Sequence, residues 1–314
     1  MKRFLAQHSA LFILAGLCVA LALVSPGFRS VANMQSVAQR TAVVGVLALG
    51  ELLVVLAAGI DLSVGSVAAL GGVAGCLAIV QLGLPWPVGL LAGVGAGLAC
   101  GLLTGLLATK GRIAPFIVTL GMMMAARGMT LVISGAKPVF GLPKNFLIIG
   151  GTVQEWWWMP VAIMIVLAAV FSLMLRYTQF GRALYAVGGN AEAARLSGIP
   201  VDRVRIIAFS VSGAMAGLAG MMLASRSSIA SPTAAEMHEL YAIAACVIGG
   251  ASLTGGEGGA FAAIAGALIM MVLYNFCNIN NISVDWQQVL VGALLVVLVF
   301  YDTWRKRRAG LLRD

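Results

Sequence analysis

The sequence predicts an all-α, polytopic membrane protein with about ten transmembrane helices, one or two of them short or broken, and with both termini in the cytoplasm. Of its 314 residues, 61% are hydrophobic and 10% are charged, whereas a soluble domain carries about 25% charged residues. Apolar runs of roughly 20 residues, long enough to cross a bilayer, recur along the chain. The 39 glycines also suit membrane helices, which pack closely through small residues.

Ten apolar segments are candidate spans, and we treat residues 1–314 as a single transmembrane domain. The candidates are residues 10–25, 42–58, 62–81, 86–108, 114–134, 158–176, 205–225, 239–250, 259–276 and 287–303. The segment 239–250 is too short to cross the bilayer alone. Met1-Lys2-Arg3 precedes the first run as in a signal peptide, but no small-x-small cleavage site follows, so an uncleaved span is expected.

The basic residues indicate how these spans are oriented. The net charge of +9 gathers at one set of membrane edges, which indicates membrane topology rather than nucleic-acid binding. With ten spans, Arg127 lies within a span, and most other Lys and Arg residues, including those at 305–308, are cytoplasmic. The outer exceptions are Arg29, Arg40, Lys137, Lys144 and Arg226. This inner excess predicts two cytoplasmic termini.

Three of the connections between the spans are long or distinctive enough to describe. Residues 28–41 are expected to form an outer amphipathic connector, and residues 135–157 the main outer loop. In that loop, Trp156-Trp157-Trp158 are expected to anchor at the lipid headgroups, with docking of an extracytoplasmic partner as the alternative. Residues 177–204 form the cytoplasmic loop.

Glycine recurs at every fourth residue of the segment 86–108. Residues four apart share one helix face, so these glycines are expected to form a groove for another helix backbone. They are Gly89, Gly93, Gly97, Gly101 and Gly105, with Gly213, Gly217 and Gly220 as a shorter version in 205–225. The spacing is not the G-x-G-x-x-G of a nucleotide-binding fingerprint.

The longest polar interruption, residues 188–200, is predicted to hold a short helix with its own start and stop. Asn190 suits the N-cap, Glu192 suits the positive end of the helix dipole, and Gly198 suits a left-handed C-terminal residue. Between them lie strong helix formers, Ala193, Ala194, Arg195 and Leu196, followed by Ser197. Such a helix suits a partner outside the membrane; the alternative is a solvated connector.

Two glycine-flanked polar stretches interrupt apolar segments in a similar pattern. In the first, residues 59–66, Gly59 suits the end of one helix and Asp61 the N-cap of the next. The second, residues 249–259, repeats Gly-x-[Asp/Ser]-Leu-[Ser/Thr]-x-Gly, with Ser252 on Asp61 and Thr254 on Ser63. Such breaks are tolerated where they are buried in protein or line a water-filled path. Both face the same side of the membrane, which does not suit an inverted repeat.

Two further acids lie in or beside apolar runs. Glu239 begins the short segment 239–250, either as an interfacial cap or as the support of a gate. Glu51 lies inside 42–58, where it faces a polar interior or forms hydrogen bonds as a neutral acid. Asp61 either only caps a helix or also lines the pathway.

No catalytic, metal or cofactor site is expected. The five cysteines contain no C-x-x-C and the two histidines are too few for a metal cluster. The motifs G-x-S-x-G, H-E-x-x-H and Walker A are absent. The chain is therefore expected not to be an enzyme, and coupling to ATP requires a separate ATPase.

Four motifs resemble one known family over nearly the whole chain. They are Gly59-Ile60-Asp61-Leu62-Ser63-Val64-Gly65-Ser66, Lys110-x-Arg112-Ile113-x-Pro115-Phe116 with Arg127-Gly128, Gly181-Arg182-x-x-Tyr185-Ala186-x-Gly188-Gly189-Asn190 with Ala193 to Ile199, and Ile248-Gly249-Gly250-Ala251-Ser252-Leu253-x-Gly255-Gly256. The chain is similar to the ribose-type permeases of bacterial ATP-binding-cassette (ABC) sugar importers.

This resemblance implies a multi-pass permease of the bacterial inner membrane that moves a monosaccharide inward. It implies three protein partners: a cytoplasmic ATPase subunit, a periplasmic sugar-binding protein, and a second permease that is either another copy of this chain or a homologue. The capped helix becomes the candidate coupling helix for the ATPase. Candidate pathway or gate residues are Asp61, Ser63, Ser252, Thr254 and Glu239.

The chain departs from the family pattern near the presumed pathway. Tyr241 stands where the family usually has an aspartate, Glu51 replaces an uncharged residue, and Ala57-Ala58 replace Thr or Ser and Gly. The transported sugar therefore need not be ribose. The main alternative is a stand-alone ion-coupled transporter that uses Asp61 and Glu51, and a membrane-embedded enzyme or a receptor role is less well supported.

Overall fold

The computed structural model describes residue 16, residue 21 and residues 26–308. Most of the expected first span, 10–25, and both chain termini lie outside the described residues. The described part is all-helical, with no named strand in it and an isolated bridge between Val139 and Ala230. Its helices are η1 (Pro26–Arg29), α3 (Val31–Leu56), α4 (Val64–Val80), α5 (Trp86–Thr109), α6 (Pro115–Ser134), η2 (Gln154–Trp156), α7 (Met159–Tyr177), α8 (Gln179–Gly189), α9 (Ala191–Leu196), α10 (Val201–Ser227), α11 (His238–Ile248), α12 (Ala260–Ile279) and α13 (Val284–Arg308).

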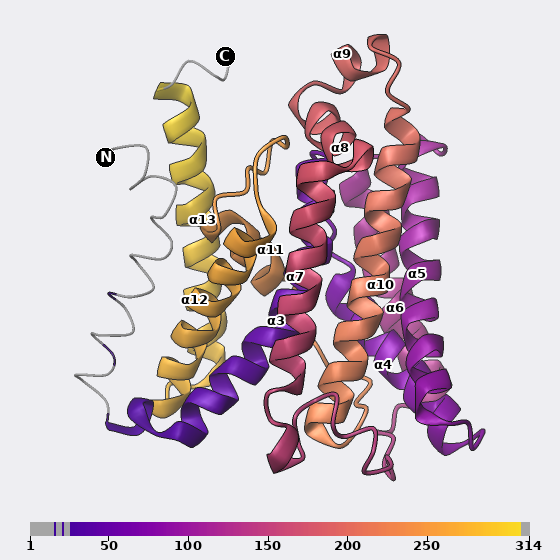
Figure 1. Cartoon of the computed structure of the whole chain (residues 1–314), viewed down its shortest axis with the longest axis vertical. Coiled ribbons are helices and arrows are strands. Elements are labelled where there is room, and N and C mark those ends of the chain that lie inside the picture. The colour runs from indigo at the N-terminus through magenta and orange to yellow at the C-terminus, as the bar shows by residue number, and fades with distance from the viewer. Residues whose placement is uncertain (1–15, 17–20, 22–25, 309–314) are drawn as a thin grey trace.

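Six helical stretches of the described chain are long and apolar enough to cross a membrane. They are Val31–Leu56, Trp86–Thr109, Pro115–Ser134, Gln154–Tyr177, Val201–Ser227 and Ala260–Ile279. Helix α11 has 11 residues, about 16 Å of rise, so it is as short as 239–250 was expected to be. Figure 1 shows α8 and α9 at one end of the bundle, where α13 also ends.

The expectation of a separate connector at 28–41 is wrong for most of that stretch. Helix α3 begins at Val31 and runs unbroken to Leu56. Ser30 caps it, because its hydroxyl accepts a hydrogen bond from the backbone N–H of Asn33 at 3.3 Å. Val31 and Met34 are exposed, whereas the helix is buried from Thr41 onward. The polar character of 28–41 therefore reflects a change of surroundings along one helix.

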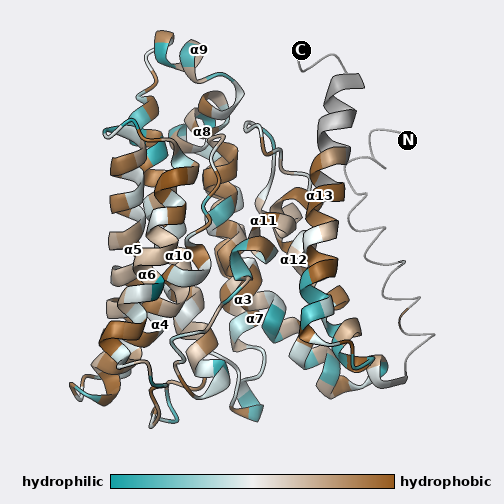
Figure 2. Ribbon diagram, turned by 180° about the vertical axis from the view of Figure 1, so that it is seen from behind, coloured by the Kyte–Doolittle hydropathy of each residue, from teal (hydrophilic) through white to brown (hydrophobic). Residues whose placement is uncertain are grey.

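The glycine face of α5 packs against α4 and α10, as its spacing predicted. A Cβ at Gly93 would lie 2.6 Å from the carbonyl oxygen of Gly71, and one at Gly97 would overlap the carbonyl oxygen of Gly213. No side chain therefore separates these backbones. Leu91 and Leu98, away from this face, are exposed, and Figure 2 shows hydrophobic colour over much of α5.

The loop 135–157 is anchored to the end of α10. The backbone N–H of Gly150 donates to Ser225 Oγ at 2.7 Å, and Ser225 Oγ donates to the carbonyl oxygen of Phe146 at 2.8 Å. The Phe146 side chain is fully buried. Trp156 and Trp158 are partly exposed, with ring centroids 5.5 Å apart, as suits side chains at an interface.

Candidate functional site

The first helix break places Asp61 and Ser63 in one hydrogen-bonded cluster. Asp61 Oδ1 accepts from the backbone N–H of Ser63 at 2.9 Å and from Ser63 Oγ at 2.6 Å. Asp61 Oδ2 accepts from Ser212 Oγ of α10 at 3.3 Å. Asp61 thus bonds the N–H expected for it, although α4 begins at Val64 and Ser63 is its N-cap residue. This cluster is buried and joins the break to α10.

The end of α3 differs from the expectation at one residue. Ala58, rather than Gly59, takes the left-handed conformation, with φ 59°. The backbone N–H of Gly59 then donates to the carbonyl oxygen of Val54 at 2.9 Å. A left-handed alanine is strained by about 1 kcal/mol or more, so the C-terminal turn of α3 holds Ala58 against its own preference.

Glu51 supports the same break from inside α3. Its Oε1 accepts from the backbone N–H of Asp61 at 3.1 Å, and its side chain is fully buried. In the described part of the chain, Oε2 has no hydrogen-bond partner and no ion pair reaches Glu51 or Asp61. A buried carboxylate without a cation is unfavourable by several kcal/mol, so the arrangement suits a neutral acid at position 51.

We expect Glu51→Gln to leave stability nearly unchanged, because its side-chain oxygen still accepts from the Asp61 N–H. Glu51→Leu has a similar size but leaves that buried N–H without an acceptor, and we expect a loss of about 1–3 kcal/mol. Thermal unfolding of the purified protein in detergent measures both. A glutamine variant as unstable as the leucine variant would contradict this explanation.

The second break folds back onto the end of α3, next to the first break. Ser252 Oγ and Thr254 Oγ1 are 2.8 Å apart, and Ser252 Oγ accepts from the backbone N–H of Thr254 at 3.1 Å. The backbone N–H of Gly256 donates to the carbonyl oxygen of Leu56, the last residue of α3, at 3.0 Å. The second stretch therefore contacts the end of α3, directly before the first stretch begins.

Glu239 at the start of α11 reaches the beginning of α4. A Cβ at Gly65 would overlap Glu239 Oε2 and lie 2.6 Å from the carbonyl oxygen of Ala235. Gly65 is in the first turn of α4, where the helix dipole favours a carboxylate.

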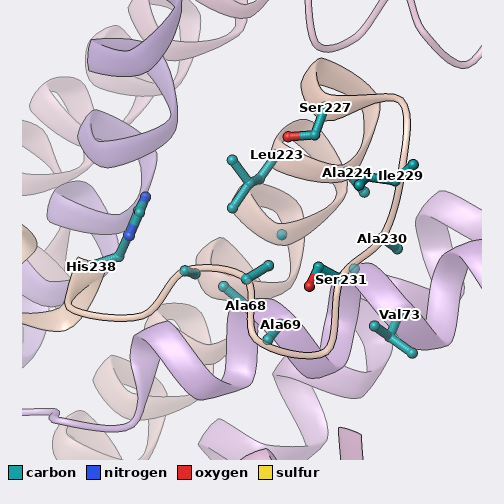
Figure 3. Close-up of a pocket in the computed structure, with 14 residues that line it drawn as sticks. Ala68, Ala69, Val73, Leu223, Ala224, Ser227, Ile229, Ala230, Ser231 and His238 are labelled. Carbon is teal, nitrogen blue, oxygen red and sulfur yellow. The ribbon is translucent and has the colours of Figure 1, made fainter. Parts of the chain in front are cut away.

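The irregular segment 228–237 covers a cavity of about 250 Å³ between α4 and α10 (Figure 3). Arg127 of α6 fixes this segment, since its guanidinium donates to the carbonyl oxygens of Pro232 at 2.7 Å and Ala234 at 3.0 Å. Ser231 and His238 are polar groups in a lining made mostly of small apolar side chains. The sequence placed Arg127 within a span, and a lone cation there is the signal that points to such a role.

Helix α9 forms with the caps expected for residues 190–198. Asn190 Oδ1 accepts from the backbone N–H groups of Glu192 at 3.0 Å and Ala193 at 2.9 Å, and Gly198 has φ +82°. Leu196 is 85% exposed, the most unusual feature of this helix. Of the other predicted residues, Ala194 is buried, Ser197 donates to the Ala193 carbonyl oxygen, and Arg195 pairs with Asp202 at 3.4 Å.

Helix α8 is a part of the loop 177–204 that the sequence analysis missed. Thr178 Oγ1 caps it by accepting from the backbone N–H of Gly181 at 3.1 Å. Leu184 and Val187 are buried, and Phe180 packs against the same core. A threonine followed by apolar residues at helical spacing is the sequence signal that could have predicted α8.

Comparison with known proteins identifies this architecture. Residues 33–299 match the family described as "Branched-chain amino acid transport system / permease component". The chain belongs to this permease family. It is 40% identical over 303 residues to the ribose import permease protein RbsC of Bacillus subtilis (strain 168), covering 95% of this chain and 92% of that protein. No solved structure matches the chain significantly.

Two further relatives are also named for pentose sugars. The chain is 38% identical over 303 residues to the L-arabinose transport system permease protein AraH of Escherichia coli (strain K12), covering 96% of this chain and 92% of that protein. It is 33% identical over 343 residues to the xylose transport system permease protein XylH of the same strain, covering 90% and 87%. The resemblance to sugar-importer permeases is thus confirmed. The chain is a multi-pass bacterial inner-membrane permease, and its family is one of transporters rather than enzymes.

Proposed function

We propose that the chain is the permease subunit of an ABC importer that moves a monosaccharide, a pentose or a hexose, into the cytoplasm. A separate ATPase subunit docks on residues 190–198 and drives the transport. The relatives named for ribose, arabinose and xylose support a sugar of this size. The sequence match to these permeases over nearly the full length supports the same transport role for the whole chain.

The observation that carries the proposal is the exposed, capped helix α9. A leucine that is 85% exposed at the tip of a polar loop has no folding purpose that the structure reveals, and exposed apolar side chains of this kind anchor protein partners. Asn190, Glu192, Ala193, Arg195 and Gly198 fix its shape. A rigid docking helix loses little conformational entropy on binding.

The pathway passes beside the two helix breaks. Asp61 and Ser63 in the first break, and Ser252 and Thr254 in the second, stabilise non-helical backbone within the bundle. Such backbone is tolerated where it is buried in protein or lines an aqueous path. Glu239, which reaches the start of α4 from the first turn of α11, is the gate residue on the side of segment 228–237.

The proposed membrane topology assigns the other components of the importer to the two sides of the permease. Ten spans with both termini cytoplasmic place α8, α9 and the helix breaks on the ATPase side, and the outer loop 135–157 on the periplasmic side. A sugar-binding protein delivers the substrate there, and a second permease copy or a homologue completes the pathway. The permease needs no cofactor of its own, and membrane lipid surrounds it.

The test is purification in mild detergent after co-expression with genes adjacent to its own, followed by reconstitution into liposomes. We expect an ATPase to remain bound in stoichiometric amount, and sugar uptake to require ATP and the binding protein. A chain that purifies alone and takes up solute only with an ion gradient would overturn the proposal. That result would favour a secondary transporter that uses the buried acids Glu51 and Asp61.

A further inference from the structure

Helix α8 contacts the second helix break and the end of α3 that leads into the first. Tyr185 Oη donates a hydrogen bond to the carbonyl oxygen of Gly258, in the second break, at 2.8 Å. One turn further on, Gly188 lies against the end of α3, just before the first break, where a Cβ would overlap the carbonyl oxygen of Leu56 and crowd the backbone nitrogen of Gly256. A single helix outside the spans thus contacts two segments separated by about 200 residues of sequence.

The junction of these three segments is made of backbone. The carbonyl oxygen of Leu56 belongs to the last turn of α3 and needs a donor from outside the helix, which the N–H of Gly256 supplies at 3.0 Å. A Cβ at Gly255 would lie 2.8 Å from the Ala58 Cβ and from the Gly188 carbonyl oxygen. With no long side chain between them, the segments must move together or separate.

Helix α8 is also joined to the docking helix α9 through a single residue, Asn190. Asn190 ends α8, because its backbone N–H donates to the carbonyl oxygen of Ala186 at 3.0 Å. The side chain of the same residue caps α9 at 2.9 and 3.0 Å. Asn190 therefore caps both helices. Because no longer linker separates them, a displacement of α9 is passed on to α8.

We propose that α8 transmits the motion of the docked ATPase to both helix breaks at once, with Tyr185 and Gly188 as its positioning residues. The proposal rests on the function proposed above. Tyr185 pulls on the second break through Gly258, while Gly188 pushes on the end of α3. The two breaks then rearrange in one step. When the contacts of Tyr185 and Gly188 are lost, ATP hydrolysis is no longer coupled to sugar transport.

Tyr185→Phe tests the pulling contact in the reconstituted importer with its ATPase and binding protein. Removing one hydrogen bond to a partly buried carbonyl is expected to lower sugar transport about tenfold, while ATP hydrolysis stays within about twofold of wild type. The ATP used per sugar therefore rises. Tyr177→Phe is the matched control, since Tyr177 is 64% exposed at the end of α7 and should change neither rate.

Gly188→Ala tests the pushing contact, with Gly189→Ala as its neighbour control. A Cβ at Gly189 meets nothing within 4 Å, so only the variant at 188 should raise the ATP used per sugar. An unchanged ratio in Tyr185→Phe, or equal loss of transport and hydrolysis, overturns the relay even if Gly188→Ala fails to fold. A wild-type chain with no ATP-driven uptake instead overturns the proposed function, and the relay with it.

Discussion

Gly97→Leu is expected to prevent the protein from folding. Even a Cβ at this position would overlap the carbonyl oxygen of Gly213 and lie 2.9 Å from the backbone nitrogen of Gly217, so leucine must push α5 away from α10. Because both neighbours are backbone atoms, no side chain can rotate to make room. We expect a loss above about 4 kcal/mol, measured as the yield of monodisperse protein in detergent.

Gly95→Leu is the control for that result. It lies on the same helix two residues away, and a Cβ there meets nothing within 4 Å. The substitution adds the same apolar surface and removes a glycine of the same helix. Similar yields for the two variants would show that the glycine face does not hold α5 against α10.

Leu196→Glu is expected to release the ATPase from the permease. Leu196 is 85% exposed, and a buried anchor at the centre of an interface contributes about 2–4 kcal/mol, or a 30-fold to 1,000-fold change in Kd. The charge adds the penalty of burying a carboxylate. Titration of the purified ATPase against the permease in nanodiscs measures the affinity.

Leu82→Glu makes the same chemical change at an equally accessible site. Leu82 is 72% exposed in the turn between α4 and α5, at the opposite end of the bundle from α9 (Figure 1). Its affinity for the ATPase should equal that of wild type. If both variants bind normally, the docking surface lies elsewhere on the cytoplasmic side.

Features fixed by local chemistry were predictable from the sequence. The fourfold glycine spacing predicted the face of α5 that contacts α4 and α10, since i and i+4 positions must share a face. Asn190 and Gly198 predicted the bounds of α9, because capping depends on side chains within one turn. The short length of α11 followed from the span 239–250 in the same way.

Features decided by distant contacts were not predictable. Ala58 rather than Gly59 ends α3 in the left-handed conformation, although alanine disfavours it. The bounds of α3 were misjudged because polar residues at its exposed start resemble a connector. The role of Arg127 depends on carbonyl groups more than 100 residues away, and those have no signature in a sequence pattern.

The hydrogen bonds from Arg127 to segment 228–237 allow the side chains of that segment to change during evolution. The guanidinium holds main-chain oxygens of Pro232 and Ala234, and the bridge from Val139 to Ala230 is likewise made of backbone. Mutations in the segment therefore leave its anchoring intact. The side chain of Ser231, which lines the cavity beneath, takes no part in that anchoring, so a change there can reshape the cavity wall while the backbone contacts persist.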